Sequence, residues 1–282
     1  MTAITVSPAS HAKVTGVPPA YRQPQRVTQT RVIRAEWTKL RTQPSAWWAM
    51  AAAVVLVIGF GVGYSLLRVA RPPHGAAAIA SFDPAAISLS GVQLAQIAVG
   101  VLGVLLITGE YATGLIRTTF AAVPRRLPVL WGKAVLVAGA VTAVSVPAAL
   151  AAFIGGQSIL SRQHLSVSLN QPGATRAVVG SALYLAVIAL LGLGLGAALR
   201  NAAGGIAALF GLLYGLPLAA GFLPGSMAED VSKFLPANAG QAVTVVQPDP
   251  SLLHPWTGFG VLCAYAAVLL GISAVRMRRG DA

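Results

Sequence analysis

Residues 84–108 read PAAISLSGVQLAQIAVGVLGVLLIT, and residues 109–133 continue GEYATGLIRTTFAAVPRRLPVLWGK. The first stretch has no charge and is long enough to cross a bilayer as a helix, which takes about 20 apolar residues. The second stretch is charged, and each charge at the centre of a membrane helix costs about 2.5–3.5 kcal/mol. It is therefore predicted to connect two membrane spans. Its charged residues are Glu110, Arg117, Arg125, Arg126 and Lys133.

The same apolar character runs through the rest of the chain. Of its residues, 56% are apolar and 10% are charged, which is too few polar residues to cover a soluble protein of this length. None of the runs alternates like a β-barrel strand. The sequence predicts an all-α polytopic integral membrane protein with six transmembrane helices. We expect them at about 47–67, 84–108, 134–154, 177–199, 202–223 and 255–275.

The distribution of basic residues predicts the orientation. With the N-terminus in the cytoplasm, fifteen of the twenty Lys and Arg residues lie inside and five outside. The positive-inside rule then places both termini in the cytoplasm, as in a multi-pass protein of the cell (plasma) membrane. The net charge of +13 is thus accounted for by topology, and nucleic-acid binding is disfavoured.

The chain outside the spans divides into distinct segments. Residues 1–30 resemble a disordered cytoplasmic tail, and residues 31–282 form the membrane domain. Within that domain, 31–43 is predicted to be an interfacial amphipathic helix, although it could simply be a basic anchor for the first span. Residues 224–254 are external and too apolar for a plain loop, so partial re-entry into the outer leaflet stays open. The interfacial helix residues are Arg34, Glu36, Trp37, Lys39 and Arg41.

A few small and polar residues stand out within the spans. Gln93 and Gln96 are three apart and share a helix face. They could make hydrogen bonds between helices or line a substrate path, and the sequence leaves both open. Glycine pairs at four-residue spacing indicate close helix packing: Gly59 and Gly63, Gly192 and Gly196, Gly211 and Gly215.

Motifs for chemistry are missing. There is no GxxxxGK[ST] phosphate loop, and the four histidines have no ligand spacing. No acid lies near the centre of a span, which argues against an ion-coupled carrier. We expect that the chain is not an enzyme by itself and binds no cofactor or metal.

The connector 109–133 has a pattern of its own. If 110–123 is helical, Ile116, Phe120 and Val123 form an apolar stripe, and Glu110, Gly114 and Arg117 share another face. Such a helix can dock into a groove of a soluble partner, although a plain cytoplasmic loop is equally compatible with the pattern.

The connector resembles that of type-2 ABC transporter permeases, the six-span subunits of ABC exporters. In that family an acid ends the second span, and a Gly–Thr pair, an apolar helix, a Pro–basic turn and a Gly–Lys pair follow. The segments 31–42 and 234–243 are similar to the family's interfacial helix and to its external segment before the last span. The corresponding connector residues here are Glu110, Thr113-Gly114 in reversed order, Leu115-Ile116, Pro124-Arg125-Arg126 and Gly132-Lys133.

The resemblance, which covers about 31–279, implies a mechanism. Two permeases, either identical copies or paralogues, would pair in the lipid bilayer, and each would dock its connector into a separate ABC ATPase subunit that binds ATP and Mg. The reversed Thr113-Gly114 order leaves the geometry of that turn open. The implied docking residues are Glu110, Thr113, Gly114, Ile116, Arg117, Phe120, Pro124, Arg125 and Arg126.

An alternative function belongs to a different class. The same connector could recruit a cytoplasmic protein to a non-transporting membrane scaffold or regulatory anchor. A neighbouring reading frame for a Walker-motif ATPase would favour the permease. The sequence does not identify a transported substrate, although apolar spans weakly favour an amphipathic one.

Overall fold

The computed structural model describes residues 29–73, 75, 82–115, 127–247 and 252–279. Regular structure within these residues is helical throughout. Two short segments depart from α geometry: a 3-10 turn, η1 (Ser161–Gln163), and a π-helix, η2 (Gly211–Gly215). The α-helices are α1 (Gln29–Thr42), α2 (Pro44–Ala70), α4 (Pro84–Ser88), α5 (Val92–Ala112), α7 (Leu127–Leu160), α8 (Ala174–Leu199), α9 (Ala202–Phe210), α10 (Leu216–Ala220), α11 (Ser226–Ser232), α12 (Pro236–Gln241) and α13 (Pro255–Arg279).

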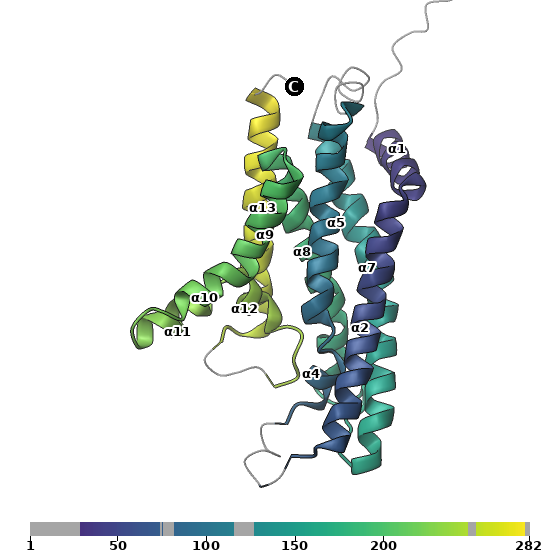
Figure 1. The fold of residues 1–282 in the computed structure, drawn as a ribbon, viewed down its shortest axis with the longest axis vertical. Coiled ribbons are helices and arrows are strands. Elements are labelled where there is room, and N and C mark those ends of the chain that lie inside the picture. The colour runs from purple at the N-terminus through teal and green to yellow at the C-terminus, as the bar shows by residue number, and fades with distance from the viewer. Residues whose placement is uncertain (1–28, 74, 76–81, 116–126, 248–251, 280–282) are drawn as a thin grey trace, which may run out of the picture.

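Six of these helical segments are long and apolar enough to cross a membrane, which confirms the predicted fold class. They are α2, α5, α7 with η1, α8, α9 to α10, and α13. The chain is therefore an all-α, multi-pass membrane protein. The start of α1 and the last turn of α13 lie at the same end of the bundle, as an even number of spans requires (Figure 1). The predicted tail 1–30 lies outside the described residues, except for Gln29 and Thr30, which begin α1.

Helix α8 forms the centre of the bundle. In its most apolar stretch 83% of the residues are buried, compared with 17% in the α9 to α10 span. Helix α5 lies against α8 so closely that a Cβ on Gly103 would be 2.0 Å from the Ala189 carbonyl oxygen. A Cβ on Gly192 would likewise be 2.1 Å from the Gly100 oxygen. Glycine permits this approach because it has no side chain.

The largest differences from the sequence expectation are in the second, third and fifth spans. The apolar run 84–108 is not one helix, because α4 ends at Ser88 and α5 begins at Val92. At the break, Gly91 packs on α2, where a Cβ would be 2.2 Å from the Leu56 oxygen. The third span is longer than expected at both ends, and the fifth is interrupted by η2.

The segment predicted to be external is partly buried. Helix α12 packs against α13, where a Cβ on Gly258 would be 2.2 Å from the Ala239 oxygen. Its residues Pro236, Ala237, Ala239 and Gly240 are buried. By contrast, α10 and α11 extend sideways from the bundle (Figure 1), and Phe222 between them is 83% exposed.

Two charged side chains bind the segment of chain that follows α12. The Asp83 carboxylate accepts hydrogen bonds from the Val246 and Gln247 amides at 2.9 and 3.1 Å. Arg176, at the start of α8, donates to the carbonyl oxygens of Val245 and Val246 at 3.0 and 3.1 Å. Asp83 and Arg176 thus join the start of α4 and the start of α8 to the chain that follows α12.

Candidate functional site

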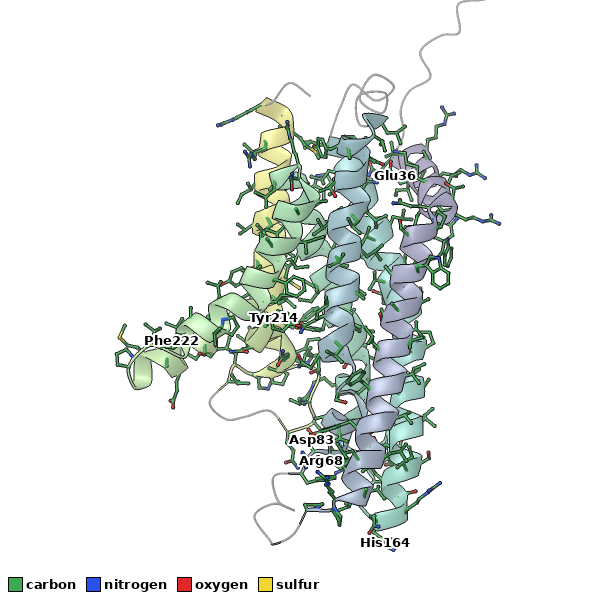
Figure 2. The ribbon with its side chains drawn as sticks, viewed as in Figure 1. Glu36, Arg68, Asp83, His164, Tyr214 and Phe222 are labelled. Atoms are coloured by element: carbon green, nitrogen blue, oxygen red, sulfur yellow. The ribbon has the colours of Figure 1, made fainter. Side chains whose placement is uncertain are left out.

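Four charged side chains form a cluster where α1 meets the ends of α5 and α7. Lys133 on α7 is buried, with its Nζ 2.5 Å from Glu36 Oε2 and 3.0 Å from Glu110 Oε1. Lys39 completes the set, with its Nζ 2.7 Å from Glu36 Oε1 and 3.0 Å from Glu110 Oε1. Each lysine contacts both carboxylates, so the charges of this ion cluster cancel. Figure 2 places Glu36 at the α1 end of the bundle.

The packing of α1 on α7 explains how the cluster forms. Val32, Glu36 and Leu40 are spaced along one face of α1 and are buried. Gly132 lets α1 come close, because a Cβ there would be 3.1 Å from a Val32 methyl group. Gln29 adds a hydrogen bond from its Nε2 to the Pro128 oxygen at 3.1 Å.

The electrostatics favour the charged forms of Glu36 and Lys39. Burial by itself raises the pKa of Glu36, but Lys133 and Lys39 outweigh it and hold that pKa below its usual value of 4.5. Burial lowers the pKa of Lys39, whereas its hydrogen bonds to Glu36 and Glu110 raise it above 10.5 overall. The cluster is therefore a set of mutually supporting ion pairs.

The connector begins differently from the expected docking helix. A single helix that runs from Glu110 through Gly114 is excluded, because α5 ends at Ala112 and Gly114 has a φ of +71°. Glycine adopts this left-handed conformation without strain, which explains why the helix stops there. Glu110 therefore belongs to α5 and the ion cluster, where its side chain is buried. Residues 116–123 of the range considered lie outside the described residues.

The rest of the predicted docking surface is not placed by the structure. Thr113 is the C-cap of α5, and its hydroxyl donates to the Gly109 oxygen at 2.8 Å. The other docking residues lie outside the described residues: Ile116, Arg117, Phe120, Pro124, Arg125 and Arg126.

A helix covers the segment predicted to be interfacial, as α1. The face of α1 that meets the bundle buries Glu36 together with Leu40, and Trp37 is 46% exposed. The reason is that Lys133 needs a counter-ion once α7 buries it. Ile33 and Trp37 instead line a groove between α1, α2 and α7. Arg34 and Arg41 are exposed, and the Arg41 carbonyl accepts from Trp47 Nε1 at 3.1 Å.

A second cluster contains only uncharged polar groups and lies about half-way along the bundle. Gln96 on α5 is buried, and its Nε2 donates to the Tyr214 hydroxyl at 3.0 Å. The Tyr184 hydroxyl on α8 donates to Gln96 Oε1. Gln241 of α12 donates from Nε2 to Gln93 Oε1 at 2.8 Å. Figure 2 shows the level of Tyr214 along the bundle.

This polar cluster reaches the surface of the bundle. Gln93 is exposed and Tyr214 is 39% exposed, whereas Tyr184 and Gln96 are buried behind them. Tyr214 lies in η2, and π-helical turns occur frequently at functional sites. The cluster thus presents uncharged amide and hydroxyl groups at the surface formed by α5, η2 and α12.

Sequence reasoning identifies some of these residues and misses others. It singles out Gln93 and Gln96, and the structure brings them together with Tyr184, Tyr214 and Gln241, which it does not single out. Tyr184 and Tyr214 give no local signal, because they lie 88 and 118 positions from Gln96 along the chain. Lys133 is predicted only to open the third span, although its position beside an apolar run could have indicated a buried partner.

Comparison with known proteins adds no family assignment. The chain matches no protein-family model, and no curated protein is detectably similar to it. Among the described residues, no three His, Cys, Asp or Glu side chains are grouped to hold a metal ion.

Proposed function

We propose that the chain is the transmembrane permease subunit of an ATP-driven ABC exporter of the type-2 family. It would form the translocation path in the cell membrane with a second copy or a paralogue. Its connector 109–133 would dock a separate ATPase subunit, which binds ATP and Mg. The order of motifs on the six-span frame supports this proposal.

The ion cluster is the observation that supports it best. Glu110 and Lys133 are the first and last charged residues of the connector, and both are held to α1 by Glu36 and Lys39. A force on the connector would thus reach α1, α5 and α7 together. A plain loop between two spans has no need of such a buried junction.

The uncharged polar cluster supports a role in transport. Gln93 and Gln96 would line the path with Tyr214 and Gln241, offering hydrogen bonds to the polar part of an amphipathic cargo. Exposed apolar side chains on the same span as Tyr214, including Phe210 and Leu218, would contact its hydrocarbon part.

Co-expression with the ATPase encoded nearest to this chain tests the proposal. We expect a detergent-stable complex whose ATP hydrolysis depends on the permease. Replacing Arg125 and Arg126 together by Glu should abolish the complex. The matched control replaces Arg278 and Arg279 by Glu, since these charges are predicted to lie on the same side of the membrane, and it should leave the complex intact.

The outcomes separate the two functions under consideration. If the intact chain captures no ATPase, the docking claim is wrong. If it captures the ATPase, yet vesicles containing the complex export nothing from a panel of antibiotics, peptides and lipids, the scaffold function is favoured.

A further inference from the structure

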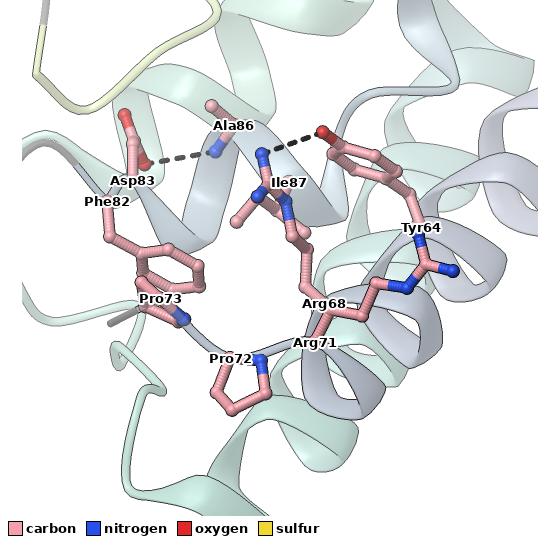
Figure 3. A pocket seen from close by; sticks show the side chains of 9 residues that line it. All are labelled: Tyr64, Arg68, Arg71, Pro72, Pro73, Phe82, Asp83, Ala86 and Ile87. Atoms are coloured by element: carbon pink, nitrogen blue, oxygen red, sulfur yellow. Dashed lines mark hydrogen bonds between the residues drawn. The ribbon is translucent and has the colours of Figure 1, made fainter. Parts of the chain in front are cut away.

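A cavity of about 440 Å³ lies at the opposite end of the bundle from the ion cluster. It is enclosed by the last turns of α2 and the first turn of α4 (Figure 3). Two arginines, Arg68 and Arg71, line it together with Tyr64, Phe82 and Asp83. It therefore combines aromatic walls with an excess of positive charge.

The acid in the cavity forms no ion pair with these arginines. Asp83 Oδ1 accepts from the Ala85 and Ala86 amides at 2.9 and 3.0 Å, and Oδ2 accepts from Val246 and Gln247. Both carboxylate oxygens are thus occupied by backbone groups. Among the described residues, no carboxylate lies within ion-pair distance of either guanidinium.

The hydrogen-bonding groups of the cavity have capacity left for a ligand. Arg68 Nη2 donates to the Tyr64 hydroxyl at 2.9 Å, and the guanidinium lies 5.1 Å from the centre of that ring. Arg68 Nε is buried and has no hydrogen-bond partner in the part of the chain that the structure describes. Because the Tyr64 oxygen accepts from Arg68, its own proton is available to an acceptor. A ligand with several anionic oxygens would satisfy these donors.

The depth of the cavity indicates where such a ligand comes from. Trp47 and Trp48, near the start of α2, are exposed and of the type that is favoured at a membrane interface. Arg68 follows Trp47 by 21 positions in the same helix, which is about 30 Å at 1.5 Å per residue. This equals the usual thickness of the hydrocarbon core. Arg68 and Arg71 then lie at the level of the lipid phosphates of the other leaflet.

We infer that this cavity is a binding site for a phosphate-type oxyanion, supplied by the phosphodiester of an anionic phospholipid. Arg68 and Arg71 bind the phosphate oxygens and Tyr64 donates a further hydrogen bond. Phe82 and Ile87 contact the carbon atoms next to the phosphate. The site is separate from the ATPase connector and does not depend on the proposed transport function.

Titration of the purified full-length chain tests this inference. The probe is dioctanoyl phosphatidylglycerol, followed by native mass spectrometry, with dioctanoylglycerol as the probe that lacks the phosphate. We expect the double variant Arg68→Gln, Arg71→Gln to weaken binding of the phospholipid by about tenfold or more. Arg162→Gln is the matched control, since Arg162 is an exposed arginine in η1, just after α7, and should change the affinity by less than about twofold.

A milder variant covers the case in which the double variant does not fold. Tyr64→Phe keeps the ring and removes the hydroxyl, and we expect it to weaken binding about threefold or more. Equal affinity of Tyr64→Phe and the unmodified chain, or equal binding of dioctanoylglycerol, would overturn the inference.

Competition distinguishes the two sources of the oxyanion. If millimolar inorganic phosphate leaves the phospholipid bound, the lipid headgroup is the ligand. The other outcome is that inorganic phosphate displaces the phospholipid from the unmodified chain, but not the phospholipid that the double variant still binds. That result would support the oxyanion site and show that the assignment to lipid is wrong.

Discussion

The two polar clusters of this protein differ in chemistry and in depth. The ion cluster uses four charges and lies at the α1 end of the bundle. The cluster around Gln96 uses amides and hydroxyls and lies about half-way along the bundle, where Tyr214 is seen in Figure 2. Each cluster is formed by side chains from at least three helices.

The difference follows from what each environment tolerates. Charges near the interface can be paired and partly solvated, as Lys39 is, with its side chain 35% exposed. At mid-membrane a charge would be costly, whereas an amide or hydroxyl with partners is tolerated. The protein thus joins its helices with ions at the edge and with neutral hydrogen bonds at the centre. This comparison predicts unequal responses to mutation.

The largest effect is expected from Lys133→Met. It leaves Glu36 and Glu110 buried with Lys39 as their shared partner, and breaking a buried pair costs about 3–5 kcal/mol. Unfolding in mixed micelles with increasing dodecyl sulfate measures the loss. Lys233→Met is the control, because its partner Asp230 is exposed, and it should cost less than about 1 kcal/mol. Similar losses for the two variants would contradict a special role of burial.

A smaller effect is expected from Gly192→Ala. The added Cβ would be 2.1 Å from the Gly100 oxygen, so α5 and α8 must separate and strain the hydrogen bond between Gln96 and Tyr184. Overpacking of this kind costs about 1–3 kcal/mol. Gly211→Ala is the control, since nothing lies within 4 Å of a Cβ there. The same unfolding assay compares them, and an unchanged midpoint for Gly192→Ala would show that the helices are looser than described.

Changes of pH should act on the ion cluster and spare the neutral one. The pKa of Glu36 is lowered from 4.5, so its contribution to stability is present above about pH 4.5 and is lost as the pH falls through the lowered pKa. The pKa of Lys39 is raised from 10.5, so its contribution is full below that pH and is lost as the pH rises through the raised value. The packing of α1 on α7 should therefore be most stable between the lowered pKa of Glu36 and the raised pKa of Lys39.

Spin labels can measure that packing directly. Labels at Arg34 and Val135, both exposed, report the distance between α1 and α7 in a chain whose native Cys263 is replaced by Ala. We expect the distance distribution to broaden in acid. Glu36→Gln should remove this acid dependence. If the variant still broadens at the same pH, another group is responsible.

The smallest effect is expected from Tyr184→Phe, which removes the hydrogen bond to Gln96. Hydrogen bonds between membrane helices are worth about 0.6 kcal/mol on average and up to about 1.7. Tyr265→Phe is the control, because its hydroxyl has no hydrogen bond with the described residues. The difference between the two variants in the unfolding assay should lie within that range. A loss as large as that of Lys133→Met would break the comparison drawn above.

The sequence was sufficient to locate the membrane spans. It was not sufficient to predict which side chains join one span to another. Apolar runs predict membrane helices because the length of a run and its lack of charge are local properties. The ion cluster joins Glu36 to Lys133 across nearly a hundred positions, and no local pattern encodes that contact. The helix considered over residues 110–123 cannot continue α5 for a local reason, the left-handed conformation of Gly114.

The glycine pairs show the same limit. All three pairs have the spacing that favours close helix contact. Gly192 and Gly196 do pack against α5, whereas nothing lies within 4 Å of a Cβ on either member of the other two pairs. Spacing reveals which residues share a face, and only the tertiary arrangement decides whether that face meets another helix.

The π-helix η2 sets the register of everything that follows it in the fifth span. A turn that holds one extra residue rotates the rest of the helix by about 100°, since an α-helix advances by 3.6 residues per turn. Deleting Leu212 would restore α geometry and rotate Tyr214 and α10 about the helix axis, away from the direction in which they now point. One residue therefore determines whether the phenol of Tyr214 points to Gln96 or to the lipid chains.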